Sequence, residues 1–253
     1  MIGSPENRMD ADVSAAPDLI DWSVYSEHYD QLCAANPAYQ EMLLDISSRI
    51  EEWALPDSAE ICDFGAGTGS FVLALASKLK RANFHHIDSD KGMVSAATRK
   101  YQEAGLNVRV YNEDLREFST APGKFDLAIC VNTIYAIPEH QKVLEDMRQW
   151  TKPGGRLYIV DFGRKVELLD WAIYILRNRV KDLGLRQTIS WYRENAENLA
   201  QNRRGAKAQA SGSYWLHSTQ EFGEALSKAG WVIEELDTCY RDCCDRAVCL
   251  NPL

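Results

Sequence analysis

Apolar residues recur at two different spacings along the chain after Pro56. Short apolar runs of strand length alternate with segments in which apolar residues return every three or four positions, as in amphipathic helices. The expected strands are Glu60–Phe64, Asn83–Asp88, Asn107–Tyr111, Phe125–Val131 and Arg156–Phe162, with helices at Ser70–Lys80, Lys91–Ala104 and Glu139–Thr151. This alternation predicts an α/β fold, a doubly wound and mostly parallel sheet that binds ligands at the carboxyl ends of its strands.

Helices are also expected before the first strand. Asn36 can cap a helix and Pro37 suits its first position, and apolar residues then follow at helical spacing as far as Trp53. An earlier helix over Ile20–Leu32 would present Trp22, Tyr25 and Tyr29 on one face. We therefore divide the chain into an N-terminal tail with lid helices, 1–56, and a core domain, 57–253.

The segment 163–213 interrupts the alternation and predicts a helical cap inserted into the core domain. It holds an amphipathic helix and then a polar, basic helix that runs towards Arg203 and Arg204; the apolar positions of the first are Leu168, Trp171, Ala172, Ile175, Leu176 and Leu183. A helix after Ser218 and two strands, Trp231–Tyr240 and Arg246–Leu250, resume the pattern. The short link between these strands predicts an antiparallel C-terminal hairpin in a seven-stranded sheet.

Composition and charge exclude several classes of protein. No apolar run approaches the roughly 18 residues of a membrane span, and no leader suggests secretion. Seven cysteines, of which Cys239, Cys243, Cys244 and Cys249 fit no common zinc spacing, predict a reduced cytoplasmic protein with free thiols and no metal. The net charge of −9 argues against a nucleic-acid partner, and no membrane partner is expected.

The most informative motif is Asp63-Phe64-Gly65-Ala66-Gly67-Thr68-Gly69, between an apolar strand and an apolar helix. Glycine allows tight turns and close approach of a ligand, and the following helix offers free N–H groups. The spacing D-x-G-x-G-x-G differs from the G-x-G-x-x-G of dinucleotide-binding proteins. With the residues after the next strands, this loop resembles that of the class I S-adenosylmethionine-dependent methyltransferases.

The resemblance covers about residues 59–162 and implies a binding site for S-adenosylmethionine. Asp88 ends the second strand, where a carboxylate suits two ribose hydroxyls; by resemblance, Met93 packs on the adenine, and Asp114 with the Leu115 N–H reads its edge. The turn Lys152-Pro153-Gly154-Gly155 into the fifth strand also matches. The expected cofactor-binding residues are Asp63, Gly65, Ala66, Gly67, Asp88, Ser89, Met93, Asp114, Leu115, Val131 and Asn132.

The motif after the fourth strand bears on the acceptor. Asn132-Thr133-Ile134-Tyr135 keeps the first and last residues of the [DNS]-P-P-[YFW] motif of enzymes that methylate amino groups of nucleic acids, but it lacks both prolines. The resemblance then implies methyl transfer to an N, O or C atom of a small molecule, by a monomer or homodimer. Expected catalytic residues are His217, Tyr29 and Asn132, and expected substrate-binding residues are Tyr25, Tyr135, Asp161, Trp171 and Tyr214.

Some alternatives stay open at the level of the sequence. His217 equally suits a cap for the next helix, beside Ser218, and His140 is a further acceptor-side candidate. Between residues 163 and 213, ten basic residues stand against five acidic ones, a balance of +5 that favours an anionic acceptor bound by Arg177, Arg179, Arg203 or Arg204. The chain could also be a binding module without turnover. A dinucleotide oxidoreductase is disfavoured by the glycine spacing and by Asp114-Leu115.

Overall fold

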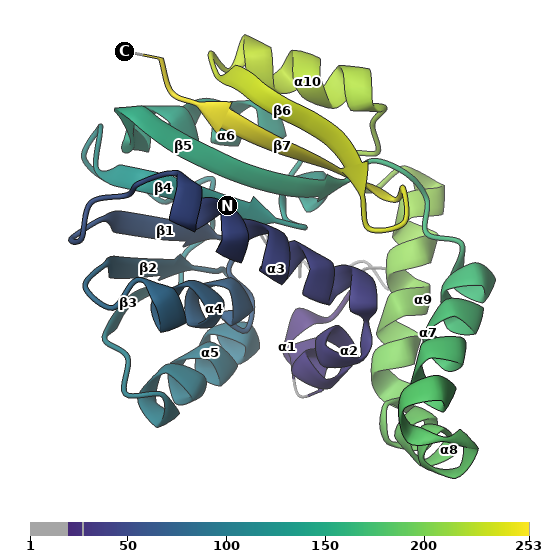
Figure 1. The fold of residues 1–253 in the computed structure, drawn as a ribbon. Helices are drawn as coiled ribbons and strands as arrows, with labels where there is room; N and C mark the ends of the chain where they lie inside the picture. The colour runs from purple at the N-terminus through teal and green to yellow at the C-terminus, as the bar shows by residue number, and fades with distance from the viewer. Residues whose placement is uncertain (1–19, 27, 253) are drawn as a thin grey trace, which may run out of the picture.

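A seven-stranded sheet forms the centre of the protein, in a computed structural model that describes residues 20–26 and 28–252 (Figure 1). Its strands are β1 Glu60–Phe64, β2 Asn83–Ile87, β3 Val108–Tyr111, β4 Phe125–Val131, β5 Thr151–Phe162, β6 Val232–Cys239 and β7 Cys244–Leu250. The spatial order is β3-β2-β1-β4-β5-β7-β6, and β7 runs antiparallel to both of its neighbours. The predicted doubly wound, mostly parallel sheet with a C-terminal hairpin is therefore confirmed.

Helices cover both faces of this sheet. One face carries α3 (Pro37–Glu52), α4 (Ser70–Lys78) and α5 (Lys91–Glu103), and the other carries α6 (His140–Trp150) and α10 (Thr219–Lys228) (Figure 1). Because side chains alternate along a strand, Leu127 and Ile129 of β4 pack under the first set and Ala128 and Cys130 under the second. Within the described residues, none of these or the other helices has both the length and the apolar character needed to cross a membrane.

The predicted boundaries differ from the observed ones where distant parts of the chain meet. β5 begins at Thr151 rather than Arg156, because the Gly154 N–H donates to the Asn251 carbonyl and the Gly155 carbonyl accepts from the Asn251 N–H, both at 2.8 Å. The helix expected from Asn36 is present. Asn36 caps α3 by accepting the Ala38 N–H at 3.1 Å, as the sequence predicted.

The single helix expected over Ile20–Leu32 is wrong. The chain forms two short helices, α1 (Trp22–Ser26) and α2 (Tyr29–Ala35), and His28 between them has non-helical angles, φ −126° and ψ 10°. The break follows from packing, because α1 lies against α5 and α9 whereas α2 lies against α3. Both helices stand beside the carboxyl ends of β1 and β4 (Figure 1), the point at which the strand order reverses and where open α/β sheets bind their ligands.

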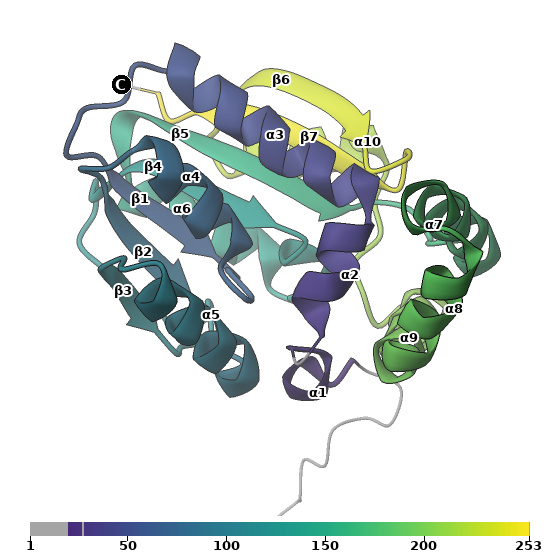
Figure 2. The same cartoon turned by 60° about the horizontal axis from the view of Figure 1, so that its bottom comes forward.

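The insertion between β5 and α10 forms three helices, where the sequence predicted two. They are α7 (Leu168–Leu183), α8 (Leu185–Glu194) and α9 (Ala196–Ser211), which together stand beside the sheet as a cap (Figure 2). Gly184, at φ +79°, separates α7 from α8. The two ends of the cap meet at the sheet, where the His217 N–H donates to the Gly163 carbonyl at 2.9 Å.

Candidate functional site

A cavity of about 260 Å³ opens at the carboxyl ends of the central strands. Nine of the eleven residues expected to bind the cofactor line it: Gly65, Gly67, Asp88, Ser89, Met93, Asp114, Leu115, Val131 and Asn132. The sequence had placed these residues after four different strands, β1 to β4. The sheet brings them to one edge because the carboxyl ends of parallel strands meet there.

The glycine loop after β1 wraps around the end of β2. The N–H groups of Gly65 and Ala66 donate to the Ile87 carbonyl at 2.9 and 3.0 Å, and the Gly67 N–H donates to Asp88 Oδ2 at 2.8 Å. Gly65 and Gly67 have φ angles of +73° and +54°, a region that other residues adopt at a cost. A Cβ on Gly65 would lie 2.2 Å from Thr133 Oγ1, so the loop depends on glycine there.

Asp63, the last acidic residue before the loop, is buried beneath it. Its side chain does not belong to the cavity lining, and its Oδ2 has no hydrogen-bond partner among the described residues. Burial, and then the charge of Asp88, raises the pKa of the Asp63 carboxyl to about 8. A buried, charged acceptor without a donor costs free energy, and protonation of this carboxyl below about pH 8 relieves that cost.

Asp63 gives the stability of the ligand-free protein a pH dependence. Its pKa is raised from an ordinary 3.8, so the folded chain binds this proton more tightly than the unfolded chain. The stability it contributes is complete below about pH 3.8 and is lost as the pH rises towards 8. Between about pH 5 and pH 8 the Asp63 carboxyl should cost the parent about 1.4 kcal/mol of stability for each unit that the pH rises towards its folded pKa. Asp63→Asn has no such carboxyl and should therefore lose less stability over the same range. Urea denaturation at both pH values measures this, and equal losses would contradict it.

Asp88 joins the glycine loop to the start of α5. Besides the Gly67 N–H, its carboxylate accepts the Asp90 N–H at 2.9 Å, and Asp90 in turn caps α5 by accepting the Met93 N–H at 2.9 Å. Burial raises the pKa of Asp88, against the opposing effect of these backbone N–H groups. The carboxylate is thus fixed at the cavity wall, and each of its oxygens can accept a further hydrogen bond.

Removing the Asp88 carboxylate should weaken cofactor binding. Asp88→Ala is expected to lower the binding free energy of S-adenosylmethionine by about 1–3 kcal/mol, the usual size of a lost hydrogen bond to a charged group. Isothermal titration calorimetry measures the change, and Asp57→Ala, on the exposed turn before β1, is the matched control. Unchanged affinity in Asp88→Ala would remove this carboxylate from the site.

Arg116 is a lining residue that sequence reasoning missed. Its guanidinium lies 2.6 Å from Asp114 Oδ2 and 3.6 Å from Glu139 Oε2, and it holds the pKa of Asp114 below its usual range. An adenine amino group expected at Asp114 would therefore share this carboxylate with Arg116. The signal in the sequence was its place directly after Asp114-Leu115. The other lining residues outside the predicted set are Trp22, Asp90, Thr133, Ala136, Ile137 and Pro138.

Asn132 lines the cavity in a left-handed conformation, with φ +53°. Its N–H donates to the Val160 carbonyl at 2.7 Å, and its Oδ1 accepts from Cys244 Sγ at 3.6 Å. Asparagine tolerates this region of φ better than most residues. The chain turns after β4, and Thr133 lies against the glycine loop, its Oγ1 3.4 Å from the carbonyl oxygens of Phe64 and Gly65.

The N-terminal helices supply the wall opposite the sheet. Trp22 and Tyr29 line the cavity, and α2 is tied to the sheet domain through Asp30, which accepts from Thr68 Oγ1 at 2.6 Å and from Lys100 Nζ at 2.7 Å. Burial raises the pKa of the Tyr29 phenol well above its ordinary value. Tyr29 therefore stays protonated near neutral pH. It can donate a hydrogen bond there, but the phenolate that could accept a proton is not populated.

Two of the residues expected to act on the acceptor, Tyr29 and Asn132, line the cavity, and His217 lies elsewhere. His217 is buried between the sheet and α10, its ring stacked on Phe222 at 4.7 Å and its Nδ1 3.2 Å from Asp245 Oδ2. Ser218 itself caps α10, with Glu221 completing the capping box. His140 is also remote from the cavity lining and stacks on Trp215 at 3.9 Å.

None of the five expected substrate-binding residues belongs to the cavity lining. The Tyr25 hydroxyl donates to Asn202 of α9 at 2.6 Å, and the Tyr135 and Tyr214 rings pack edge to face at 4.8 Å. Asp161 is buried, accepts the Thr133 N–H at 3.1 Å, and keeps Oδ2 without a partner among the described residues. Trp171 packs on Tyr240 at 4.8 Å. Their part in acceptor binding stays a prediction.

The lining fits S-adenosylmethionine by its chemistry. Gly65 and Gly67 line the cavity with a backbone conformation that other residues rarely adopt. The Oδ2 atom of Asp63 is buried at the start of this loop without a hydrogen-bond partner among the described residues. The fixed Asp88 carboxylate suits two hydroxyls, and apolar residues around Met93 suit a flat base. Within the described residues, no group of three or more His, Cys, Asp or Glu side chains is arranged to hold a metal ion.

Comparisons with known proteins agree with this geometry. A family model described as a methyltransferase domain matches residues 61–155. The carboxy-S-adenosyl-L-methionine synthase of Campylobacter lari is 30% identical over 184 residues, which are 71% of this chain and 77% of that protein. The ubiquinone/menaquinone biosynthesis C-methyltransferase UbiE of Syntrophotalea carbinolica is 27% identical over 125 residues, 49% of this chain and 53% of that one.

Solved structures show the same fold. The magnesium protoporphyrin IX methyltransferase of Synechocystis PCC 6803, crystallised with bound S-adenosylmethionine, superposes with a TM-score of 0.56 at 18% identity. The match covers 84% of this chain and 79% of that one. At this identity, the likeness concerns the arrangement of helices and strands alone.

Proposed function

Because the chain belongs to the class I S-adenosylmethionine-dependent methyltransferases, we propose that it methylates a nitrogen, oxygen or carbon atom of a small-molecule acceptor. The observation that carries the proposal is the cavity itself, in which residues following β1 to β4 converge beneath Trp22 and Tyr29. Because Trp22 and Tyr29 of the N-terminal helices cover one side of this cavity, a small acceptor suits it better than a nucleic-acid strand or a protein chain.

The residues of the sheet edge would hold the cofactor. Asp88 would accept hydrogen bonds from two ribose hydroxyls, Met93 would pack against the base, and the Leu115 N–H would donate to its edge. Asp63, beneath the glycine loop, would compensate in its ionised form the positive charge of the ammonium group at the amino-acid end of the cofactor. When bound, S-adenosylmethionine supplies a methyl group already activated by a positively charged sulfur, so no metal is needed to activate it.

The remaining residues would position the acceptor and exclude water. Trp22, Ile137 and Pro138 give the cavity apolar walls, and the Asn132 amide and Tyr29 hydroxyl offer polar atoms for orientation. In-line alignment of nucleophile, methyl carbon and sulfur accounts for much of the rate in such a reaction. The acceptor forms a bond to the methyl carbon as the carbon–sulfur bond breaks, and it loses a proton if it carries one.

The acceptor should carry a nucleophilic atom that reacts without a strong base from the protein. Asp88 and Asp114 are occupied by N–H donors and by Arg116, and Tyr29 stays protonated near neutral pH. An amine, an acidic phenol or an enolisable carbon needs little help from a base. The anionic acceptor predicted from the basic segment stays a prediction, because no described residue of 163–213 lines the cavity.

A second candidate activity follows from the relative in Campylobacter lari. That protein is named a carboxy-S-adenosyl-L-methionine synthase, and its similarity to this chain extends well beyond the matched methyltransferase domain. A chain of this type would alter the cofactor itself rather than pass its methyl group on. Mass spectrometry of the cofactor after incubation with a metabolite extract would reveal the added carboxyl group.

The deciding experiment is transfer of a labelled methyl group. The purified full chain is incubated with methyl-labelled S-adenosylmethionine and a cell extract, which is then separated into small molecules, protein and nucleic acid. We expect label in the small-molecule fraction, and we expect Asp88→Ala to reduce it. Label confined to protein or nucleic acid would overturn the proposed acceptor class.

A further inference from the structure

The outward face of α7 carries a stripe of exposed apolar side chains, which we call the α7 stripe. Leu169, Ile173, Leu176 and Leu183 are 82%, 48%, 40% and 40% exposed, and half-buried Val180 completes the series. Steps of four, three, four and three residues place all five on one side of a helix, as in the seam of a coiled coil.

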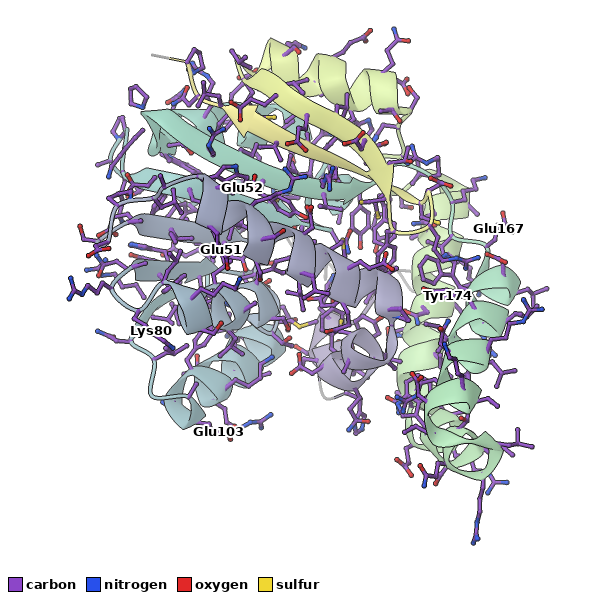
Figure 3. The ribbon with its side chains drawn as sticks, viewed as in Figure 1. Glu51, Glu52, Lys80, Glu103, Glu167 and Tyr174 are labelled. Atoms are coloured by element: carbon purple, nitrogen blue, oxygen red, sulfur yellow. The ribbon has the colours of Figure 1, made fainter. Side chains whose placement is uncertain are left out.

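This stripe is not what attaches the cap to the rest of the protein. Trp171 and Tyr174, on the opposite side of α7, pack against the tip of the β6–β7 hairpin, where Arg241 lies over both rings at 5.1 and 4.3 Å. Tyr174 lies on the body side of α7, while Glu167 stands at the start of the helix (Figure 3). One side of α7 is therefore packed against the body, whereas the opposite side keeps four apolar side chains that are 40% to 82% exposed.

The exposure is concentrated on the cap. Eight large apolar residues are strongly exposed in the described chain, and six of them lie on α7 and α8. These are the four exposed members of the stripe together with Leu185 and Ile189. Single exposed apolar residues are common on protein surfaces, whereas contiguous patches mark interaction sites. The remaining two, Leu44 and Val232, lie on separate elements of the body.

We propose that the α7 stripe binds the α7 stripe of a second copy of this chain, with the two helices antiparallel across a twofold axis near Ile173. In an antiparallel pair the flanking positions of one helix face the same positions of the other. Asp170 and Arg177 occupy one flank of the stripe, one turn either side of that axis. Asp170 of each copy then faces Arg177 of the partner subunit, and the symmetry forms the ion pair twice.

Both charged side chains are accessible to a second copy. Asp170 is 62% exposed although it pairs with Arg241 of its own chain at 2.7 Å, and Arg177 is exposed. The charges are complementary only when the two helices run antiparallel, because each acidic residue then faces the basic residue of the same surface on the second copy. It is this charge pattern that selects a second copy of the chain as the occupant of the stripe.

The pairing would also brace the active-site side of the cap. The inner helix α9 holds α1 through Tyr25, which donates to Asn202 at 2.6 Å, and through Gln201, which accepts the Asp21 N–H at 3.0 Å. α1 carries Trp22 into the cavity lining. Association through α7 is therefore expected to steady the wall of the cavity without placing any residue of the second copy in it.

The oligomeric state of the full chain tests the proposal. Sedimentation velocity over a range of protein concentrations should show a dimer, and Ile173→Glu should weaken its association about tenfold or more by burying an unpaired charge on the axis. Leu44→Glu, at a residue 70% exposed on α3, is the matched control and should remain dimeric. A monomeric parent protein, or an Ile173→Glu variant that associates as well as the parent, would overturn the proposal.

Charge exchange tests the register. Asp170→Arg and Arg177→Asp should each weaken the dimer several-fold, and the double variant should restore it, whereas Arg241→Ala controls for the pair within the chain and should leave association unchanged. Failure of the double variant to recover would overturn the antiparallel register. Stronger association after deletion of residues 1–19 would assign the stripe to that segment instead and would also overturn it. Calorimetry with S-adenosylmethionine should give near-parental affinity throughout, so failure here is distinguishable from failure of the methyltransferase activity.

Discussion

Replacing Gly65 with alanine is expected to weaken S-adenosylmethionine binding about a hundredfold or more. The left-handed backbone at φ +73° alone costs an alanine about 1–2 kcal/mol. The added Cβ would also lie 2.2 to 2.8 Å from three atoms of the Thr133 side chain. Relieving that overlap must shift either the loop or Thr133, both of which line the cavity. Calorimetric titration of the cofactor measures the loss.

A second glycine separates the two causes. Gly105 has a similar φ of +65°, but a Cβ there would meet nothing within 4 Å, so Gly105→Ala should lose stability without losing cofactor affinity. Adding Thr133→Ala to Gly65→Ala removes the overlapping atoms and should recover part of the affinity. Thermal unfolding of each variant shows whether the fold is kept. A Gly65→Ala protein that is folded and binds normally would show that the loop can move away from Thr133 at no cost.

Deleting residues 1–33 should reduce turnover about a hundredfold or more while the sheet domain stays folded. The deletion removes Trp22 and Tyr29 from the cavity wall and Asp30 from its contacts with Thr68 and Lys100. We expect these helices to order over the bound cofactor and exclude water, which is how a lid contributes to catalysis. Circular dichroism reports on the fold, and methyl transfer reports on turnover.

Two further variants make the deletion interpretable. Removing only residues 1–19, which lie outside the described part of the chain, should leave turnover within a few-fold of the parent. Trp22→Ala, which removes one wall of the cavity and keeps α2 in place, should fall between the two. Full turnover after deletion to residue 33 would mean that α1 and α2 contribute packing alone.

The cofactor edge of the site was predictable from the sequence because its signals are local. A strand, a turn and a helix follow one another within a few residues at Asp63–Ser70, and the turn needs glycine for reasons that hold within the turn itself. Asp88 and Asp114 likewise follow directly from the ends of β2 and β3. Parallel strands then bring these ends together, so local order along the chain becomes proximity in space.

The acceptor side was not predictable in the same way. Whether His217 faces the cavity or the core depends on α10 packing against the sheet, which places Phe222 under its ring. Tyr25 is directed towards α9 by Asn202, a residue far away in sequence. Nothing in the local pattern of either residue reports these partners. The same reason explains the break between α1 and α2, which follows from packing against different helices.

The contact between His217 and Gly163 has a consequence for how this protein can change. Since the chain leaves the sheet at Gly163 and returns beside it at His217, the closure of the loop is already secured by a 2.9 Å hydrogen bond at its base. Lengthening such a closed excursion costs little, about 0.6 kcal/mol for each doubling of length. The length and outer surface of this segment can thus change like those of a detachable module, provided that Arg164, which pairs with the buried Asp245 of β7 at 2.9 Å, and the contacts of α9 with α1 are kept.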